Sequence, residues 1–122
     1  ATTFNYINSK GEFLGGAISF GLKTSMDALT AATAKLPKIE LVAPPKALGK
    51  TTITNMQSGI IYGFIGMVEY MVKKLKAEEG DAKVIATGGL SEIISESSAI
   101  IDKVDRTLTL RGLNIIYNLN RK

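Results

Sequence analysis

The stretch TITNMQSGIIYGFIGMVEYMVKKLK, residues Thr52–Lys76, decides how the chain folds. Apolar side chains recur in it at steps of three and four residues, which places them on one stripe of a helix. The stripe comprises Met56, Ile60, Phe64, Met67, Met71 and Leu75, and it is widened by Ile61, Ile65, Val68 and Val72. We therefore expect a helix over Thr52–Lys76 that other parts of the fold cover on most of its circumference.

Three glycines, Gly59, Gly63 and Gly66, lie inside this expected helix. Each costs a helix about 1 kcal/mol relative to alanine, so we expect another backbone to pack closely against them in compensation. A membrane span is the rival interpretation. The apolar core, residues 60–72, falls short of the ~20 residues that a bilayer requires, and Glu69 interrupts it. The sequence therefore favours a packed helix over a membrane span.

The composition bounds the class of protein. A chain of 122 residues, 45% of them hydrophobic, fits one globular domain with its own core. It contains neither cysteine nor histidine, which excludes disulfides, thiolate nucleophiles and the commonest general base. Acid–base chemistry would then fall to carboxylates, lysines or tyrosines, or to residues outside this chain. With no signal-peptide pattern at its start, the chain is expected in the cytoplasm.

The net charge of +4 does not indicate a nucleic-acid surface. Such a surface gathers lysines and arginines together with aromatic residues. Most lysines here are scattered, and the cluster over residues 73–76 is followed at once by Glu78 and Glu79. A solvated helix end is the better interpretation of that cluster.

The first segments predict a β-hairpin. The strands are expected over Thr2–Asn8 and Glu12–Phe20, with Ser9–Gly11 as the turn. Gly15 and Gly16 lie inside the second strand, where glycine marks a bulge or the close approach of another backbone or a ligand.

The later segments alternate between helical and strand patterns. They predict a helix over Lys23–Lys35, a strand over Ile39–Val42, the long helix, a buried strand over Lys83–Thr87, a short helix over Leu90–Glu96 and a last helix over Thr107–Asn120. The order hairpin, helix, strand, helix, strand, helix is typical of an α/β fold. The segment from Ser95 to Asp105 is expected to be a loop.

Several positions in these elements have expected roles. Pro37 should end the first helix, and Ser91 should cap the short one. Buried faces are expected at Leu22, Met26, Leu29 and Ala32 of the first helix, and at Leu110, Leu113, Ile116 and Tyr117 of the last. Gly112 in the last helix again suggests close packing. Asp27 and Glu69 are carboxylates on otherwise apolar helices, which makes them candidates for functional groups.

The entry to the long helix, Gly49-Lys50-Thr51-Thr52, is the first candidate for ligand binding. It matches the tail of a phosphate-binding loop, but position 44 holds proline where that loop needs glycine. A threonine hydroxyl and free amides at a helix N-terminus still suit a carboxylate, phosphate or hydroxyl group. A plain helix cap, with Thr51 or Thr52 as the capping residue, explains the same residues.

Two glycine-rich segments are further candidates. Gly88 and Gly89 directly follow the expected strand over Lys83–Thr87, where a flat ligand such as adenine can lie on the backbone. A tight strand-to-helix turn is the alternative. Residues 15–21 either line a ligand or form a bulged strand that packs on a neighbour.

Taken in order, six blocks resemble the C-terminal half of a type III pantothenate kinase, a family also called the Bvg accessory factor family. They are ATTFNYIN, GEFLGGAIS with GLKTSMDAL, AKLPKIEL, GKTT with MQSGIIYG, VIATGGL and LTLRGL. The resemblance implies one ribonuclease-H-like α/β domain, residues 1–122, of the acetate and sugar kinase, Hsp70 and actin superfamily. In that superfamily two related domains enclose ATP.

The resemblance also implies an activity. Such kinases phosphorylate pantothenate to 4'-phosphopantothenate with ATP and Mg²⁺, the first step of coenzyme A biosynthesis. They are cytoplasmic homodimers that need a monovalent cation, K⁺ or NH₄⁺. The helix over Thr52–Lys76 resembles one that helps to build the dimer.

Individual residues match family positions. Thr52 matches a threonine that contacts pantothenate, and Gly88 and Gly89 match the glycine pair that binds adenosine. Thr2 and Thr3 match the residues that follow an Asp-x-Gly-Thr phosphate motif. The resemblance thus implies substrate and nucleotide contacts for this chain.

The chain departs from the family pattern in ways that bear on activity. The Asp-x-Gly-Thr motif and the N-terminal domain, with its phosphate loop and catalytic aspartate, are absent, so the chain itself holds no catalytic residue or metal ligand and should be inactive alone. Phe20 stands where proline is usual, and Thr51 where asparagine is usual. A non-catalytic binding or regulatory module of the same fold is the alternative interpretation.

Overall fold

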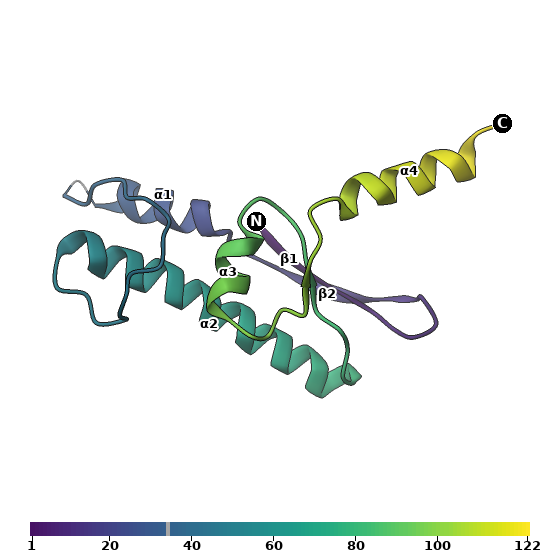
Figure 1. The fold of residues 1–122 in the computed structure, drawn as a ribbon, viewed down its shortest axis with the longest axis horizontal. Helices are drawn as coiled ribbons and strands as arrows, with labels where there is room; N and C mark the ends of the chain where they lie inside the picture. The colour runs from purple at the N-terminus through teal and green to yellow at the C-terminus, as the bar shows by residue number, and fades with distance from the viewer. Residues whose placement is uncertain (34) are drawn as a thin grey trace. The chain divides into compact units, whose positions relative to one another are not determined.

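A computed structural model describes residues 1–33 and 35–122 (Figure 1). The elements, in chain order, are β1 (Thr2–Ile7), β2 (Phe13–Ser19), α1 (Leu22–Ala32), α2 (Thr52–Glu79), β3 (Ile85–Ala86), α3 (Ser91–Ser97), β4 (Lys103–Val104) and α4 (Leu108–Asn120). The chain divides into two compact units, Ala1–Ala82 and Lys83–Lys122. The mixture of helices and strands confirms the expected α/β class. Whether the whole chain forms a single domain stays a prediction.

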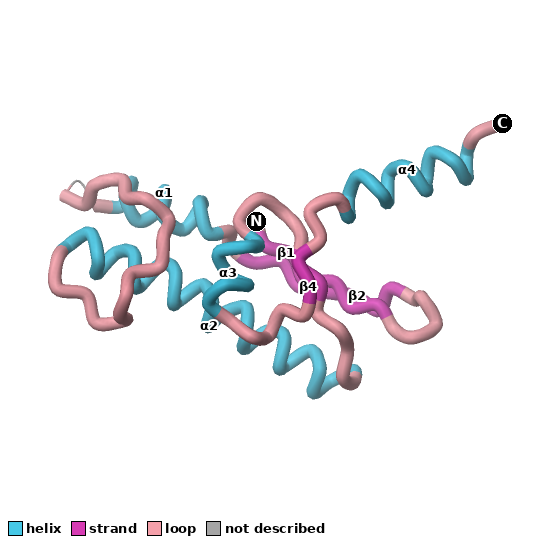
Figure 2. Tube along the Cα trace, in the orientation of Figure 1, coloured by secondary structure: helices cyan, strands magenta, loops and turns pink. Residues whose placement is uncertain are grey.

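The first unit opens with the expected hairpin, in which β1 and β2 pair antiparallel (Figure 2). The side chain of Asn8 holds its turn, because Oδ1 accepts hydrogen bonds from the backbone N–H groups of Lys10, at 3.0 Å, and Glu12, at 2.9 Å. Gly11 completes the turn with a φ of 78°, a conformation that glycine adopts without strain.

The two glycines of β2 have different structural roles. Tyr6 pairs with Gly15 while Ile7 pairs with Phe13, which leaves Leu14 as the extra residue of a bulge. Gly15 lies beside this bulge with a φ of 129°. A Cβ on Gly16 would lie only 1.8 Å from the carbonyl oxygen of Phe4 on β1. Both interpretations of the glycine pair, a bulge and a close backbone approach, are therefore confirmed.

The core of the first unit lies where α1 packs on the buried side of α2. It consists of Leu22 and Met26 from α1 with Met56, Ile60, Ile61, Phe64, Ile65, Val68 and Val72 from α2. The predicted long helix is confirmed. It runs three residues beyond Lys76, to Glu79. Gly80 caps this end, and its N–H donates to the Lys76 carbonyl at 2.8 Å.

The first helix is shorter than its pattern predicted. It ends at Ala32, well before Pro37, and the hydroxyl of Thr33 donates to the carbonyl of Leu29 at 3.2 Å. That hydroxyl satisfies a carbonyl of the last turn, so the helix ends without proline. Leu29 and Ala32 are exposed, contrary to prediction. Position 34, which the predicted helix included, lies outside the described residues.

No strand forms over Ile39–Val42, and the prediction of one was wrong. The segment is irregular, and side chains of α2 bind one carbonyl in it and two in the loop that follows it. Gln57 Nε2 donates to Glu40 at 3.1 Å, Tyr62 donates to Pro44 at 2.5 Å, and Ser58 donates to Ala47. The prolines at 44 and 45 remove two backbone donors, which disfavours a ladder here.

The second unit contains a short parallel pair, β3 with β4, and two helices. The strand predicted over Lys83–Thr87 shrinks to two residues, and Ile85 is 48% exposed, so it is not a buried strand. β4 falls in the segment that was predicted to be loop. Ser91 does not cap α3, because its hydroxyl instead donates to the carbonyl of Gly88 at 2.7 Å.

Two packing predictions fail within the described residues. The side chains of α4 that were expected to point inward, Leu110, Leu113, Ile116 and Tyr117, are exposed. A Cβ added to Gly59, Gly63, Gly66 or Gly112 would meet nothing within 4 Å, so the described residues pack no backbone against these glycines. Among residues 1–33 and 35–122, no helix combines the length and apolar character needed to cross a bilayer.

The hairpin yields a test of the fold. Gly16→Ala places a methyl group against the backbone of Phe4, which cannot move aside as a flexible side chain would. We expect the free energy of unfolding to fall by about 1–3 kcal/mol. Gly66→Ala, in open space on α2, should instead raise it by roughly 0.5–1 kcal/mol because alanine is the better helix former. Urea unfolding of both variants measures the difference, and equal effects would contradict the hairpin register.

Candidate functional site

The N-terminus of α2 is closed by a reciprocal pair of threonines. Thr54 N–H donates to the hydroxyl oxygen of Thr51 at 3.1 Å, and Thr51 N–H donates to the hydroxyl oxygen of Thr54 at 3.0 Å. This is a capping box, which satisfies two otherwise unpaired amides. Thr51 is therefore the cap, and the helix begins normally with threonine at the position where asparagine was expected.

Thr52, in contrast, takes no part in capping this helix end. It is the first residue of α2, its side chain is exposed, and within the described residues its hydroxyl makes no hydrogen bond. A hydroxyl at this position lies where the helix dipole favours negative or acceptor groups. The structure thus separates the two roles that the sequence left open: Thr51 caps, and Thr52 is available.

The loop before α2 fits tightly around the helix end. A Cβ on Gly49 would lie 2.3 Å from the side-chain amide of Asn55 and 2.6 Å from Asn55 N, so only glycine fits there. With its amide oriented to donate, Asn55 reaches the carbonyls of Gly49 at 2.9 Å and Thr51 at 3.2 Å. These contacts fix the entry to the helix and with it the position of Thr52.

A groove of about 600 Å³ opens beside Thr52 between α1 and α2. Its lining is Phe20, Ser25, Leu29, Leu36, Thr52, Asn55, Met56, Gly59, Ile60, Gly63 and Phe64. Most of these residues are apolar, and the polar side chains are those of Ser25, Thr52 and Asn55. The groove suits a small molecule with an apolar body and a polar group near Thr52.

Phe20 forms one wall of this groove. Its ring meets that of Phe64 edge-on, with centroids 6.3 Å apart, a favourable aromatic geometry. The chain still turns into α1 at Gly21, so phenylalanine at position 20, where proline was expected, does not disrupt the turn. The sequence signal that would have found the groove is the helical spacing of Thr52, Met56, Gly59 and Gly63 on α2.

Gly88 and Gly89 of the second unit also have different structural roles. Gly88 has a φ of 106°, and its carbonyl accepts from both the backbone N–H and the hydroxyl of Ser91, so it forms the tight turn before α3. Gly89 has an ordinary φ, and a Cβ there would meet nothing within 4 Å. The turn interpretation therefore accounts for Gly88 and leaves Gly89 open to a ligand.

The other sequence candidates belong to the first unit, not to the unit of this turn. Thr2 and Thr3 begin β1, where they pair with Ser19 and Ile18. Together with Thr52 they belong to the first unit, whereas Gly88 and Gly89 belong to the second. Among residues 1–33 and 35–122, no group of three or more acidic side chains is arranged to hold a metal ion.

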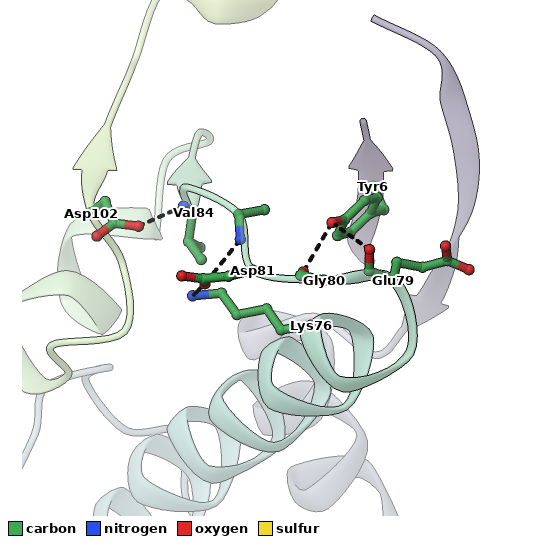
Figure 3. A network of polar contacts seen from close by, with 8 residues as sticks. Tyr6, Lys76, Glu79, Gly80, Asp81, Val84 and Asp102 are labelled. Atoms are coloured by element: carbon green, nitrogen blue, oxygen red, sulfur yellow. Dashed lines mark hydrogen bonds and ion pairs between the residues drawn. The ribbon is translucent and has the colours of Figure 1, made fainter. Parts of the chain in front are cut away.

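The sequence did not predict a network of hydrogen bonds and an ion pair at the C-terminal end of α2 (Figure 3). The hydroxyl of Tyr6 on β1 donates to the carbonyls of Gly80, at 2.9 Å, and Glu79, at 3.3 Å. Asp81 accepts from Lys76, 3.2 Å away, and from the N–H of Ala82, and these bonds lower the pKa of its carboxyl. The network joins the hairpin to the end of the long helix.

In the second unit, carboxylates hold the short strands and the start of α4. Asp102 accepts from the N–H of Val84 at 2.6 Å, also drawn in Figure 3. Partial desolvation opposes ionisation of Asp105, but hydrogen bonds from Thr107 and the charges of Arg111 and Lys103 lower its pKa overall. Both are structural contacts, far from an apolar setting suited to acid–base catalysis.

A family model described as type III pantothenate kinase matches residues 1–74. The chain belongs to the type III pantothenate kinase family. Curated relatives of that name are similar along the whole chain. The protein of Geotalea uraniireducens (strain Rf4) is 49% identical over 123 residues, and that of Moorella thermoacetica (strain ATCC 39073 / JCM 9320) is 53% identical over 121 residues. These alignments cover 100% and 98% of this chain but 48% of each relative.

This chain therefore spans about half the length of the curated relatives that it matches. A crystal structure from Campylobacter jejuni, assigned as a conserved transcriptional activator of the Baf family, has the same fold. It superposes with a TM-score of 0.66 at 20% identity and covers 97% of this chain and 53% of that one. At this identity the likeness concerns the fold alone.

The division of roles at the helix end predicts separate effects on stability. Thr51→Ala removes the cap and should lower the free energy of unfolding by about 1 kcal/mol. Thr52→Ala removes a hydroxyl without an intramolecular partner and should change it by less than about 0.5 kcal/mol. Urea unfolding followed by circular dichroism measures both, with Thr51→Ser as the control that keeps the hydroxyl. A larger loss for Thr52→Ala than for Thr51→Ala would mean that the cap is misassigned.

Proposed function

We propose that the intact protein to which this chain belongs phosphorylates pantothenate with ATP, giving 4'-phosphopantothenate, the first step of coenzyme A biosynthesis. The observation that carries this proposal is the family match over residues 1–74, together with relatives about half identical along the whole chain. Phosphoryl transfer depends mainly on positioning and charge neutralisation. A chain without histidine or cysteine can therefore contribute to it.

In this proposal residues 1–122 form the C-terminal domain of a two-domain kinase with the ribonuclease-H-like fold of the acetate and sugar kinase, Hsp70 and actin superfamily. The N-terminal domain supplies the phosphate loop and the catalytic aspartate. Support comes from the length comparison, because the chain spans 48% of its curated relatives. The chain alone is then inactive, and the intact protein is a cytoplasmic enzyme.

Thr52 is the proposed pantothenate contact. Pantothenate combines a carboxylate, two hydroxyls and an amide with an apolar dimethyl group, so it needs both polar partners and an apolar surface. The groove between α1 and α2 offers an apolar lining beside the available Thr52 hydroxyl. That hydroxyl can bond a substrate oxygen while Met56 and Ile60 contact the apolar part.

Gly88, Gly89, Thr2 and Thr3 are the proposed nucleotide contacts. Gly89 has no side chain in the way of a flat ring, and Gly88 holds the turn that presents it. Thr2 and Thr3 would follow the phosphate motif supplied by the rest of the protein. In such an enzyme Mg²⁺ neutralises the phosphates of ATP, and K⁺ or NH₄⁺ is held by the aspartate of that same motif, outside this chain.

We also propose that α2, over Thr52–Lys76, helps to form a homodimer. Gly59, Gly63 and Gly66 leave open space on the helix surface, so a second backbone can approach closely there. Such an approach would offset the helical propensity that three glycines forfeit.

A non-catalytic binding or regulatory module is the alternative function. The feature in its favour is Phe20, which stands where the resemblance leads us to expect proline and which lines the groove together with Phe64. An assay of the intact protein with ATP, Mg²⁺, K⁺ and pantothenate separates the two functions. The kinase proposal predicts 4'-phosphopantothenate, detected by mass spectrometry. Its absence, in a folded protein that binds pantothenate or a macromolecule, would favour the module.

Substitution of Thr52 tests the substrate contact in the intact enzyme. Thr52→Val keeps the shape of the side chain but removes the hydroxyl, so we expect KM for pantothenate to rise about tenfold, the effect of one lost hydrogen bond to a substrate. KM for ATP should stay unchanged, and Thr52→Ser should retain most of the activity. Steady-state kinetics on the three proteins provide the measurement. An unchanged KM for pantothenate in Thr52→Val would remove Thr52 from the site.

A further inference from the structure

The last helix, α4, is the most exposed apolar element of the chain. Seven large apolar side chains on its 13 residues are between 40% and 79% exposed, and none is buried. They are Leu108, Leu110, Leu113, Ile115, Ile116, Tyr117 and Leu119. Isolated apolar residues are normal on a protein surface, but such a concentration marks a surface that something else covers.

The hydrogen bonds and the ion pair that join α4 to the rest of residues 83–122 lie at its start. Asp105, whose N–H donates to Ala86 at 2.8 Å, accepts from Thr107 and pairs with Arg111 in the first turn. Further along, the side chains of Asn118 and Asn120 bond to carbonyls of α4 itself. An isolated helix of this length is marginal in water, so α4 needs tertiary packing to be stable.

The apolar side chains cover more than one face of α4. At 100° per residue, Leu108, Ile115 and Leu119 share one face, and Leu110, Leu113 and Tyr117 share another. A polar stripe of Arg111, Asn114 and Asn118 separates them on one side. A single neighbouring helix, such as the same helix of a second copy, covers one face and leaves the other in water. The pattern fits insertion into a groove.

The occupant follows from length and charge. The curated relatives align with 98–100% of this chain, α4 included, and have about as much sequence again outside the alignment. Residues 108–122 carry Arg111, Arg121 and Lys122 and no acidic residue. Arg121 and Lys122 make no ion pair with the described residues. A complementary surface is therefore an apolar groove with an acidic rim near the end of α4.

We infer that α4 docks into such a groove on the part of the same polypeptide that lies outside this chain. The inference rests on the two-domain arrangement under Proposed function. Both apolar faces are covered in the docked state, and the stripe of Arg111, Asn114 and Asn118 faces solvent. Because Gly88 and Gly89 belong to the same unit as α4, docking would anchor the proposed adenosine turn to the rest of the kinase.

Amide hydrogen exchange on the intact protein and on this chain alone tests the inference. Opening of a docked helix is limited by the packing that covers it, so residues 108–120 should exchange at least about tenfold more slowly in the intact protein than in the isolated chain. The amides of α2 report in each sample whether the first unit is folded. Equal exchange of α4 in both samples would overturn the inference. So would protection in the isolated chain that grows with concentration, because a second copy would then be the occupant.

A matched pair of variants in the intact protein keeps the test independent of how the isolated chain behaves. Ile116→Asn places an amide on the apolar surface and should speed exchange over residues 108–120 while α2 stays protected. Asn118→Ser, on the polar stripe, should leave exchange as in the wild type. Equal exchange in both variants would contradict docking. Pantothenate kinase activity of the wild-type protein is measured in a separate assay. An active enzyme whose α4 is not protected from exchange refutes the docking alone. An inactive protein whose α4 is protected refutes the proposed function alone.

Discussion

Burial of one side of α2 fixes each element that shapes the groove of the first unit. Ile61, 1% exposed, lies at the centre of this contact, and Leu22 and Met26 bring α1 against it. Polar side chains of the same helix donate hydrogen bonds to the irregular segment before it. Gln57, Ser58 and Tyr62 bind carbonyls of that segment and hold it without a strand ladder. Packing and hydrogen bonding by one helix thus place Phe20, Leu36 and Thr52 around a common opening.

The chemistry of the site follows from how the helix ends are satisfied. At its N-terminus, the reciprocal bonds of Thr51 and Thr54 leave the neighbouring Thr52 hydroxyl to the groove. At its C-terminus, Gly80 and the hydroxyl of Tyr6 use the last carbonyls and join the helix to the hairpin. In the proposed site, a ligand hydroxyl or carboxylate at Thr52 would meet a helix end that these capping bonds already hold, which limits the ordering that binding requires.

Features that depend on near neighbours in sequence could be predicted, and features that depend on distant partners could not. The spacing of apolar residues gave α2, and glycines within a strand gave the bulge and close approach at Gly15 and Gly16. The predicted strand over Ile39–Val42 failed because no strand of the described residues pairs with it, and the side chain of Gln57 on α2 binds its Glu40 carbonyl instead. The inward face predicted for α4 was wrong because residues 83–107 of its own unit do not bury it. The available hydroxyl of Thr52 was anticipated, whereas Ser25 and Asn55 join the groove only once α1 packs on α2.

The glycines of α2 and the apolar faces of α4 point to the same conclusion by separate routes. Both are surfaces whose sequence is suited to packing, and the described residues leave both open. A family member that spans about half the length of its relatives is expected to show such surfaces where further protein adjoins it. Both open surfaces support the proposal that the chain is one half of a two-domain kinase.

The most direct test of that claim is the intact mass of the native polypeptide, with its sequence upstream of Ala1. The account predicts a polypeptide roughly twice as long as this chain, in line with its curated relatives, with Asp-x-Gly-Thr immediately before Ala1. A native polypeptide that begins at Ala1, purified without any second chain that carries that motif, would contradict it.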